Sequence, residues 1–511
     1  MNYENIQVGK FTLESLTTGM YNNPEIVYRE YIQNAVDSFD NAISQKLMTL
    51  DECRIEIIVD AEREEISIKD NGTGICKELA VKTLLDIGNS SKTHTSNRGF
   101  RGIGRLGGLS YCKKLSFCTT SQNEPEKTLV TFDCAKLKEL LIPGQANEYD
   151  LQKVISAVTE VKVLSEQASA HYFIVKMEGV DDISSLLDMD FVKDYVAQVA
   201  PVPFRSRFYW GREIKSEFEK SDLNIAEYSI FVGNSFESLV QIYKPYKISV
   251  GVSARAGVDR DEIQGISYFD IKDTLNNLLA IGWYGELNFY GTVSDDQVSG
   301  IRIRQGNILI GDNKTLSPYF IETRFNNWCI GELYVISDDL IPNARRDGFE
   351  SNKTFLDFCD CFRKTIGTEL GTKIRIASKA RNNPMKKAIT KTEKTIAKTE
   401  KILENGFNSS FEKESIVKEL EGARKDLYII PKDAPQELSS QKAELVDKLA
   451  GLVEAVGESK NYKTKKDISS EFSKSEKKII QAMLEVLTKN FERPIVDSLY
   501  KEFLQELKKK G

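Results

Sequence analysis

One stretch of nine residues, 29–37 (REYIQNAVD), constrains the fold of this chain more than any other. It puts Glu30, Asn34 and Asp37 at positions i, i+4 and i+7, which share one face of an α-helix. Apolar residues and an aromatic residue fill the positions between them, so the pattern predicts a partly buried helix. A buried carboxylate one turn before an asparagine can activate water beside a divalent metal ion.

A turn-forming segment follows a predicted strand at residues 70–75 (DNGTGI). Asp70 at the strand end can offer its carboxylate to an amino group, while Gly72 and Gly74 let the backbone turn close to a flat ring. Adenine presents such an amino group at its edge. An ordinary β-turn is the alternative interpretation, because Asp, Asn and Gly all favour turns.

A polar stretch with several hydroxyl groups comes next, at residues 87–93 (IGNSSKT). Ser91 and Lys92 suit contact with a phosphate group, although such residues are equally common in any solvated loop. No G-x-x-x-x-G-K-[ST] motif occurs in the chain, so the sequence excludes a P-loop.

A glycine-rich segment then precedes a predicted helix. Gly99, Gly102 and Gly104 allow backbone N–H groups to face an anion at the start of that helix. Gly102, Gly104 and Gly107 also match the dinucleotide-binding pattern G-x-G-x-x-G, which requires a hydrophobic strand directly before it. Residues 90–98 are polar throughout, so the sequence excludes a Rossmann fold here.

Composition narrows the class of protein. The chain has 511 residues, 41% of them hydrophobic, and a net charge of −6, which indicates several globular domains and no overall signal for nucleic-acid binding. No apolar run reaches the length of a membrane span and the N-terminus is polar, so we expect no signal peptide and no membrane partner. The eight cysteines are scattered, which predicts reduced thiols and a cytoplasmic protein. The two histidines, His94 and His171, share no motif, which leaves little material for histidine-based triads or metal sites.

Changes in pattern along the chain predict three regions. Residues 1–190 alternate helical and strand-like segments, and a Pro-Val-Pro boundary at 201–203 introduces a second α/β region over 200–375. Residues 376–511 are rich in Lys, Glu, Ser and Thr, which predicts a helical, partly linker-like region. We expect strands at 54–60, 65–69, 115–120, 173–177, 246–253, 287–292, 301–310 and 331–336.

Two apolar stripes mark the last region. The first follows a heptad seam and the second follows helical spacing, at Met385, Ile389, Thr392, Ile396, Thr399 and Leu403, and then at Ile480, Leu484, Leu487, Phe491, Ile495, Leu499, Phe503 and Leu507. Such stripes are buried either within the chain or against a second copy. The region therefore predicts either internal packing or dimerisation.

The four motifs stand in the order found in the GHKL ATPase superfamily, which includes gyrase, heat-shock chaperones, histidine kinases and mismatch-repair ATPases. They resemble its N-box, its D-x-G-x-G motif, its lid and its G-x-x-G-x-G motif. The resemblance implies an α+β fold: a Bergerat-type ATP-binding α/β sandwich, then an α/β middle domain of the transducer type, then a helical C-terminal region. It also implies ATP and Mg²⁺ as ligands.

Within that superfamily the first two regions resemble heat-shock protein 90. Residues 300–311 (GIRIRQGNILIG) are similar to a middle-domain strand of that family, and residues 338–347 (DDLIPNARRD) are similar to the segment with its catalytic arginine. The register places that arginine at Arg346, with Arg345 as the neighbour that could substitute. Two features depart from the family: His171 stands near the position of an expected Gly-Thr pair, and residues after 375 do not resemble its C-terminal domain.

The resemblance implies a role for each residue of the candidate site. Glu30 would polarise the attacking water, Arg29 would fix its orientation, and Asn34 would hold Mg²⁺ between the phosphates. Arg346 or Arg345 would reach across from the second region to stabilise charge on the γ-phosphate. Asp37 is expected to support the helix.

The remaining residues would bind the nucleotide. The adenine would lie against Asp70 and Gly74, with Gly72 in the same turn, and the phosphates would lie in a cradle of glycines with the lid close by. The cradle and lid residues are Gly99, Gly102, Gly104, Ser91 and Lys92.

Two functions remain open at this point. The first is an ATP-driven, homodimeric conformational clamp of the chaperone type, acting on protein clients. The second is a clamp associated with nucleic acid or defence, as in gyrase-like and microrchidia-like members of the superfamily. Lysine-rich segments near 377–401 and 460–466 would suit the second, although a solvated helical face explains them as well.

Overall fold

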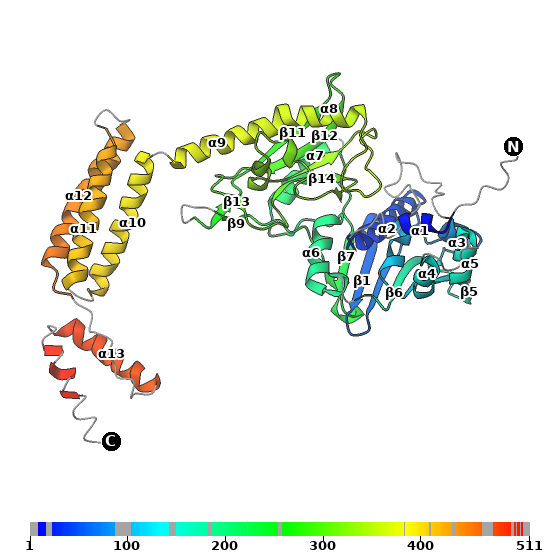
Figure 1. Ribbon diagram of the computed structural model, residues 1–511, viewed down its shortest axis with the longest axis horizontal. Helices are drawn as coiled ribbons and strands as arrows, with labels where there is room; N and C mark the ends of the chain where they lie inside the picture. Colours follow the sequence, from blue (N-terminus) through cyan, green and yellow to red (C-terminus); the bar gives the residue numbers. More distant parts are fainter. Residues whose placement is uncertain are drawn as a thin grey trace. The chain divides into compact units, whose positions relative to one another are not determined.

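The computed structural model in Figure 1 describes residues 9–16, 23–86, 104–142, 150–181, 185–221, 223–253, 258–382, 384–407, 410–431, 436–461, 474–491, 495–496, 498–500 and 502–503. The chain divides into two compact units, Met1–Arg375 and Ile376–Gly511. Within the described ranges, no helix combines the length and the apolar character needed to cross a membrane.

An eight-stranded sheet organises the first part of unit Met1–Arg375. Its strand order is β5-β4-β3-β6-β2-β1-β7-β8, and every neighbouring pair is antiparallel except β1 and β7. The strands are β1 (Arg54–Asp60), β2 (Glu65–Asp70), β3 (Lys114–Thr120), β4 (Glu126–Asp133), β5 (Thr159–Ser165), β6 (Tyr172–Glu178), β7 (Ser229–Gly233) and β8 (Val240–Gln241).

The sheet crosses the boundary expected from the sequence. β7, drawn in green in Figure 1, lies beside the blue β1, although it comes after residue 200. Two strands from beyond residue 200, β7 and β8, thus continue the first sheet. The division into domains at 1–190 and 200–375 stays a proposal.

Helix α2 (Ile26–Ser44) packs against this sheet for reasons that its sequence makes plain. Val27, Ile32, Val36 and Phe39 are all buried, at the spacing that puts them on one face. Each such side chain contributes about 1.5–3 kcal/mol on burial. The helix ends at Ser44, and Lys46, two residues later, has a φ of 58°. The N–H groups of Lys46 and Leu47 donate back to the last turn, which satisfies carbonyls left open by the helix end.

Five further helices accompany the first sheet. They are α1 (Phe11–Leu16), α3 (Lys77–Leu85), α4 (Cys134–Leu141), α5 (Leu151–Val158) and α6 (Met189–Val199). Asp133, Asp150 and Asp188 begin α4, α5 and α6, and each accepts hydrogen bonds from backbone N–H groups of the first turn.

Two smaller sheets form the rest of this unit. One has the order β11-β12-β16-β14-β15 and the other the order β10-β9-β13. Their strands are β9 (Ser249–Ser253), β10 (Arg260–Glu262), β11 (Ile266–Lys272), β12 (Leu278–Gly285), β13 (Thr292–Val293), β14 (Gly300–Gln305), β15 (Ile308–Ile310) and β16 (Ile330–Val335). The central strands β12, β14 and β16 are buried along nearly their whole length, as expected for strands covered on both faces. The helices of this part are α7 (Trp210–Lys220), α8 (Lys353–Phe362) and α9 (Thr368–Asn382).

The expected strand at 287–292 is wrong. Only its last residue, Thr292, belongs to a strand, and Phe289 has a φ of 54°. The backbone N–H groups of Asn288 and Tyr290 each donate to the buried carboxylate of Asp261, at 3.2 Å. A side chain from elsewhere in the chain thus takes the hydrogen bonds that a neighbouring strand would otherwise accept.

A buried ionic cluster joins the strands of the five-stranded sheet. The Lys244 ammonium donates to Glu332 at 2.7 Å, and to Asn307 Oδ1 and Tyr334 Oη at 3.0 Å each. The other carboxylate oxygen of Glu332 accepts from Arg304 Nε. Burial, together with the charge of Arg304, lowers the pKa of Lys244 to about 7, and Glu332 offsets only part of this effect. Burial acts to raise the pKa of Glu332, but Arg304 and Lys244 outweigh it and lower that pKa to about 2.

Unit Ile376–Gly511 is helical in its described residues. It contains α10 (Pro384–Asn405), α11 (Ser410–Asp426), α12 (Gln436–Glu458) and α13 (Lys474–Asn490). Helices α10, α11 and α12 share one apolar core, and Ile389, Thr392, Ile396 and Thr399 of the predicted seam are buried in α10. In the second stripe Ile480 and Leu484 are buried, whereas Phe491 and Ile495 are about half exposed.

Candidate functional site

The start of α2 carries the acidic part of the predicted site. Glu30 is only 7% exposed, and Asn34 lies one turn further along, half-buried. Among the described residues, Glu30 Oε1 has no hydrogen-bond partner, although it is buried. A buried carboxylate oxygen without a partner is costly, which makes this atom a candidate for contact with a ligand.

The glycine segment meets the same helix. Gly104 begins η2 (Gly104–Ser110), a 3-10 helix, and a Cβ added there would collide with Oε2 of Glu30. Tyr31 of α2 fixes this contact, because its hydroxyl donates to Arg105 O at 3.1 Å and accepts from Gly108 N at 3.2 Å. The structure thus brings Gly104 and Glu30 together, and a larger residue at 104 would displace the Glu30 carboxylate. Ser91, Lys92, Gly99 and Gly102 lie outside the described residues.

The turn after β2 is built around its aspartate. Asp70 is buried at the strand end, and its Oδ1 accepts from Gly72 N at 2.9 Å. Gly74 has a φ of 62°, and a Cβ there would collide with the Thr120 carbonyl oxygen. A Cβ at Gly72 would collide with Ser38 Oγ of α2. Both glycines are therefore required by space, and the turn packs directly on the helix that carries Glu30 and Asn34.

Three residues that the sequence analysis did not propose hold this turn in place. Ser38 Oγ accepts from Thr73 N at 3.0 Å, and Thr119 Oγ1 accepts from Ile75 N at 2.9 Å. His171 Nδ1 lies 2.7 Å from Gly72 O. Ser38 stands four residues after Asn34, so helical spacing could have identified it. The other two come from distant strands and carry no local signal.

Arg29 connects α2 to the segment that contains Arg345 and Arg346. Its Nη2 donates to Arg345 O at 2.7 Å and its Nη1 donates to Arg346 O at 3.4 Å. Arg346 is buried and has a φ of 55°, whereas the side chain of Arg345 is exposed. Gly311 N also donates to Arg346 O, at 2.8 Å. The predicted catalytic arginines therefore lie on a segment whose backbone is bound to the first turns of α2.

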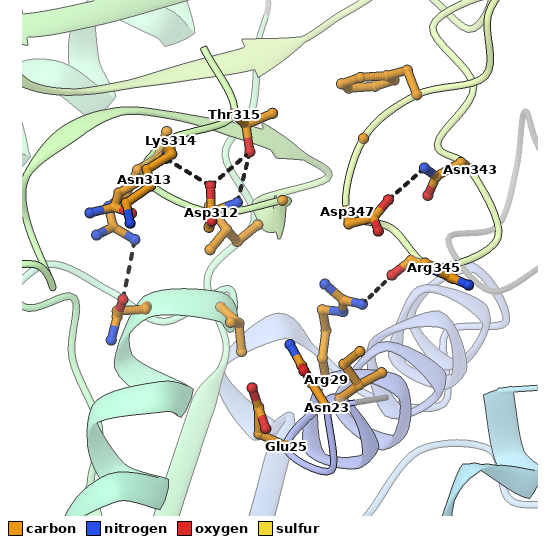
Figure 2. A pocket seen from close by; sticks show the side chains of 18 of the residues that line it. Asn23, Glu25, Arg29, Asp312, Asn313, Lys314, Thr315, Asn343, Arg345 and Asp347 are labelled. Carbon is orange, nitrogen blue, oxygen red and sulfur yellow. Dashed lines mark hydrogen bonds between the residues drawn. The ribbon is translucent and has the colours of Figure 1, made fainter. Parts of the chain in front are cut away.

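A cavity of about 820 Å³ opens beside this contact. Figure 2 shows Asn23, Glu25 and Arg29 on one side of it, facing Asp312, Lys314 and Arg345 from the loops of the second part. Its lining mixes acidic and basic side chains. Of the predicted site residues, Arg29 and Arg345 line this cavity, while Glu30, Asn34 and Asp70 are not among its lining residues.

Within the described ranges, one group of side chains is close enough to share a metal ion. Cys76, Glu78 and Glu124 offer ligand atoms within 4.8 Å of one another. Both carboxylate oxygens of Glu124 accept from Lys77 N at 3.1 Å, at the start of α3. Capping of that helix accounts for Glu124 without a metal. Asn34, the predicted Mg²⁺ ligand, does not belong to this group.

Comparisons with known proteins match the region with these features. Residues 21–169 match the family described as histidine kinase-, DNA gyrase B-, and HSP90-like ATPase. The chain is 28% identical over 166 residues to the chaperone protein HtpG of Rickettsia typhi, covering 28% of this chain and 25% of that protein. It is 36% identical over 90 residues to HtpG of Anaplasma marginale, covering 16% of this chain and 14% of that protein.

A longer match covers a larger share of the chain. The chaperone protein HtpG of Wigglesworthia glossinidia brevipalpis is 27% identical over 261 residues, covering 44% of this chain and 39% of that protein. The chain thus spans between about one seventh and two fifths of the lengths of these relatives. The predicted α+β fold of the GHKL type is confirmed, and residues 21–169 match the histidine kinase-, DNA gyrase B- and HSP90-like ATPase family.

Proposed function

We propose that the chain is an ATP-hydrolysing conformational clamp, resembling in its first two parts the HtpG chaperones that it matches. The observation that carries the proposal is the buried Glu30 carboxylate, whose Oε1 has no partner among the described residues and whose Oε2 faces Gly104. This glycine is at the end of the segment expected to cradle phosphates. A carboxylate kept ready beside an anion site is suited to polarising water.

The residues present fit the ligands that the family implies. The Asn34 carboxamide oxygen, one turn from Glu30, would hold Mg²⁺, which when bound supplies positive charge to the phosphates. Glu30 Oε1 would accept a proton from the attacking water. Asp70, at the end of β2, would accept a hydrogen bond from the adenine amino group.

Arg29 gives the proposal its link to conformational change. Because its guanidinium donates to the carbonyls of Arg345 and Arg346, the helix with Glu30 and the segment with both arginines are held together. Arg346 would stabilise charge on the γ-phosphate from this segment. Hydrolysis would then require both parts of the unit, which couples turnover to their contact.

The test is ATP binding and turnover by the full chain. We expect the wild-type protein to bind ATP in the presence of Mg²⁺ and to release phosphate. Asp70→Asn should weaken ATP binding by at least about 100-fold, because an amide nitrogen would face the base amino group. Asp60→Asn is the matched control, since Asp60 ends β1 and accepts from the turn residues Glu62 and Arg63. Unchanged ATP affinity in Asp70→Asn contradicts the assigned base contact.

Homodimerisation and the nature of the client stay part of the proposal, and size-resolved mass with and without a non-hydrolysable ATP analogue tests the first. The nucleic-acid clamp is the alternative. Two lysines of the basic segment, Lys391 and Lys398, form ion pairs with Asp426 and Glu419 of the same unit, at 2.6 and 2.9 Å. These pairs reduce the positive charge left for phosphates. Salt-dependent binding to DNA would favour the alternative.

A further inference from the structure

The peptide group of Gly72 is held on both sides. Its N–H donates to Asp70 Oδ1 at 2.9 Å, and its carbonyl oxygen lies 2.7 Å from His171 Nδ1. The two contacts come from neighbouring strands: Asp70 ends β2, His171 directly precedes β6, and Asp70 pairs with Phe173 across the ladder. The turn is therefore fastened to the strand that runs beside the one from which it emerges.

The chemistry of the contact assigns the proton. A carbonyl oxygen can only accept a hydrogen bond, so His171 Nδ1 must donate. Both the neutral Nδ1–H tautomer and the imidazolium carry that proton. His171 Nδ1 is therefore the donor in its contact with Gly72 O.

We propose that His171 is a positioning residue of the nucleotide site: its Nδ1–H fixes the Gly72 peptide and, through it, the Asp70 carboxylate that receives the adenine amino group. The inference rests on the proposed ATP-binding function. Asp70 Oδ1 accepts a hydrogen bond from Gly72 N, so the orientation of the carboxylate depends on the orientation of that peptide group. Without the imidazole, Gly72 O loses its side-chain donor and the peptide is free to rotate away.

His171 differs from the other two anchors of the turn in the kind of backbone group that it binds. The other anchors of the turn, Ser38 and Thr119, bind the N–H groups of Thr73 and Ile75, whereas His171 binds a carbonyl group. Two N–H groups of the turn and one of its carbonyl groups are thus each bound by a side chain, and the three side chains come from separate parts of the chain. A base stacked on this turn would then meet a rigid surface, which lowers the entropic cost of binding.

The experiment uses the full chain with three substitutions of one residue. Asn places an amide nitrogen near the position of Nδ1, whereas Gln places it near the position of Nε2. We expect His171→Ala and His171→Gln to weaken ATP and ADP binding about five- to tenfold, the loss of one hydrogen bond, while His171→Asn stays within about twofold of wild type. Calorimetric titration measures these affinities, and thermal unfolding confirms that each variant is folded.

A further readout and a control variant separate positioning from general structural damage. The kcat at saturating ATP should stay within about twofold of wild type in all three variants, because none touches Glu30. Tyr172→Phe is the neighbouring control, since that hydroxyl donates to Glu166 and not to the turn.

The outcomes are distinct. If wild-type protein binds ATP and His171→Ala binds it equally well, the positioning role is wrong while the proposed function stands. Rescue by Gln as complete as rescue by Asn also overturns it, because the contact is then not made through Nδ1. Failure of the wild-type protein to bind any adenine nucleotide overturns the proposed function and the inference together.

Discussion

Two buried carboxylates in unit Met1–Arg375 have opposite surroundings. Glu332 is paired with Lys244 and Arg304 and also accepts from Tyr334, so its charge is met from several sides. Glu30 is almost as deeply buried, yet one of its oxygens has no partner among the described residues. Both sites hold a carboxylate away from water, but within the described parts of the chain only Glu332 has partners for both of its oxygens.

The two carboxylates therefore differ in what their surroundings favour, which is stability of the fold in one case and contact with a ligand in the other. A buried charge with full compensation keeps strands in one arrangement, since Arg304 also donates to carbonyls of Asn307 and Gln198 at 3.0 and 2.9 Å. A buried charge with an unmet oxygen destabilises the fold unless a ligand completes it. The surroundings of Glu332 thus favour stability of the fold, whereas those of Glu30 fit the catalytic role proposed for it.

The largest expected effect is on turnover at Glu30. Glu30→Gln keeps the shape of the side chain but removes the base, so kcat should fall about 10²–10⁴-fold while ATP affinity changes little. The melting temperature should stay equal or rise, because an unpaired carboxylate has been replaced by a neutral group. A phosphate-release assay and a thermal melt measure the two effects. A melting temperature that falls as far as in a Glu332 variant would make Glu30 structural instead.

The next effect is on stability at Glu332. Glu332→Gln leaves Lys244 and Arg304 buried without their shared anion, and we expect a loss of about 3–5 kcal/mol in the free energy of unfolding. Urea denaturation of the full chain measures this loss. Glu369→Gln is the control, since its ion pair with Lys373 is about half exposed and should cost under about 1 kcal/mol. Equal losses in the two variants would remove the distinction drawn for the buried cluster.

A smaller effect is expected at the arginine segment. Arg346→Ala should slow turnover about tenfold or more with little change in ATP affinity, because its side chain is expected to contact the phosphates only as the reaction proceeds. Arg345→Ala is the matched control: Arg29 binds the backbone carbonyl of Arg345, and its exposed side chain is not needed for that contact. Steady-state kinetics of both variants decide between them. A larger loss of kcat at Arg345 would show that the register is shifted by one residue.

The smallest effect concerns pH. Burial and Arg304 lower the pKa of Lys244 to about 7, below its ordinary value of 10.5, so between these values the unfolded chain binds more protons than the folded chain. Stability should therefore rise with pH through the lower part of this window, by at most about 1.4 kcal/mol per pH unit. Urea denaturation from pH 7 to 9 measures the slope. Lys244→Met should flatten it, and an unchanged slope in that variant would assign the pH dependence to other groups.

Local pattern predicted several elements of the fold well. The pattern of residues 29–37 predicted a partly buried helix, which is part of α2, and strands were expected at 54–60 and 65–69, where β1 and β2 lie. The order of the four motifs predicted the GHKL type of fold, which is confirmed. Pattern failed at 287–292, where Asp261 takes the backbone hydrogen bonds and no strand forms. Local spacing cannot predict a hydrogen bond to a side chain that is distant in the sequence.

The candidate site divides in the same way. Glu30, Asn34 and Asp70 were proposed from their spacing together with the resemblance to the GHKL superfamily, and their roles with ATP stay predictions, as do those of Arg345 and Arg346. The anchoring of the turn at residues 70–75 by Thr119 and His171 could not be foreseen, because Thr119 lies in β3, His171 directly precedes β6, and these strands meet only in the folded sheet. The residue types at 70–75 predicted a turn, but only the structure shows the side-chain contacts that hold it.

The sequence by itself determined which helix face carries the carboxylate and the amide, where glycine is needed, and the match of residues 21–169 to a GHKL-type family. The first two properties depend on neighbours within a few residues, where helical and strand periodicity acts. Only the tertiary structure decided that Gly104 lies against Glu30, that Arg29 binds the carbonyls of Arg345 and Arg346, and that Glu332 is compensated while Glu30 Oε1 has no partner among the described residues. Such contacts join segments tens to hundreds of residues apart, and their energy depends on burial and hydrogen-bond geometry that exist only once the sheets have packed.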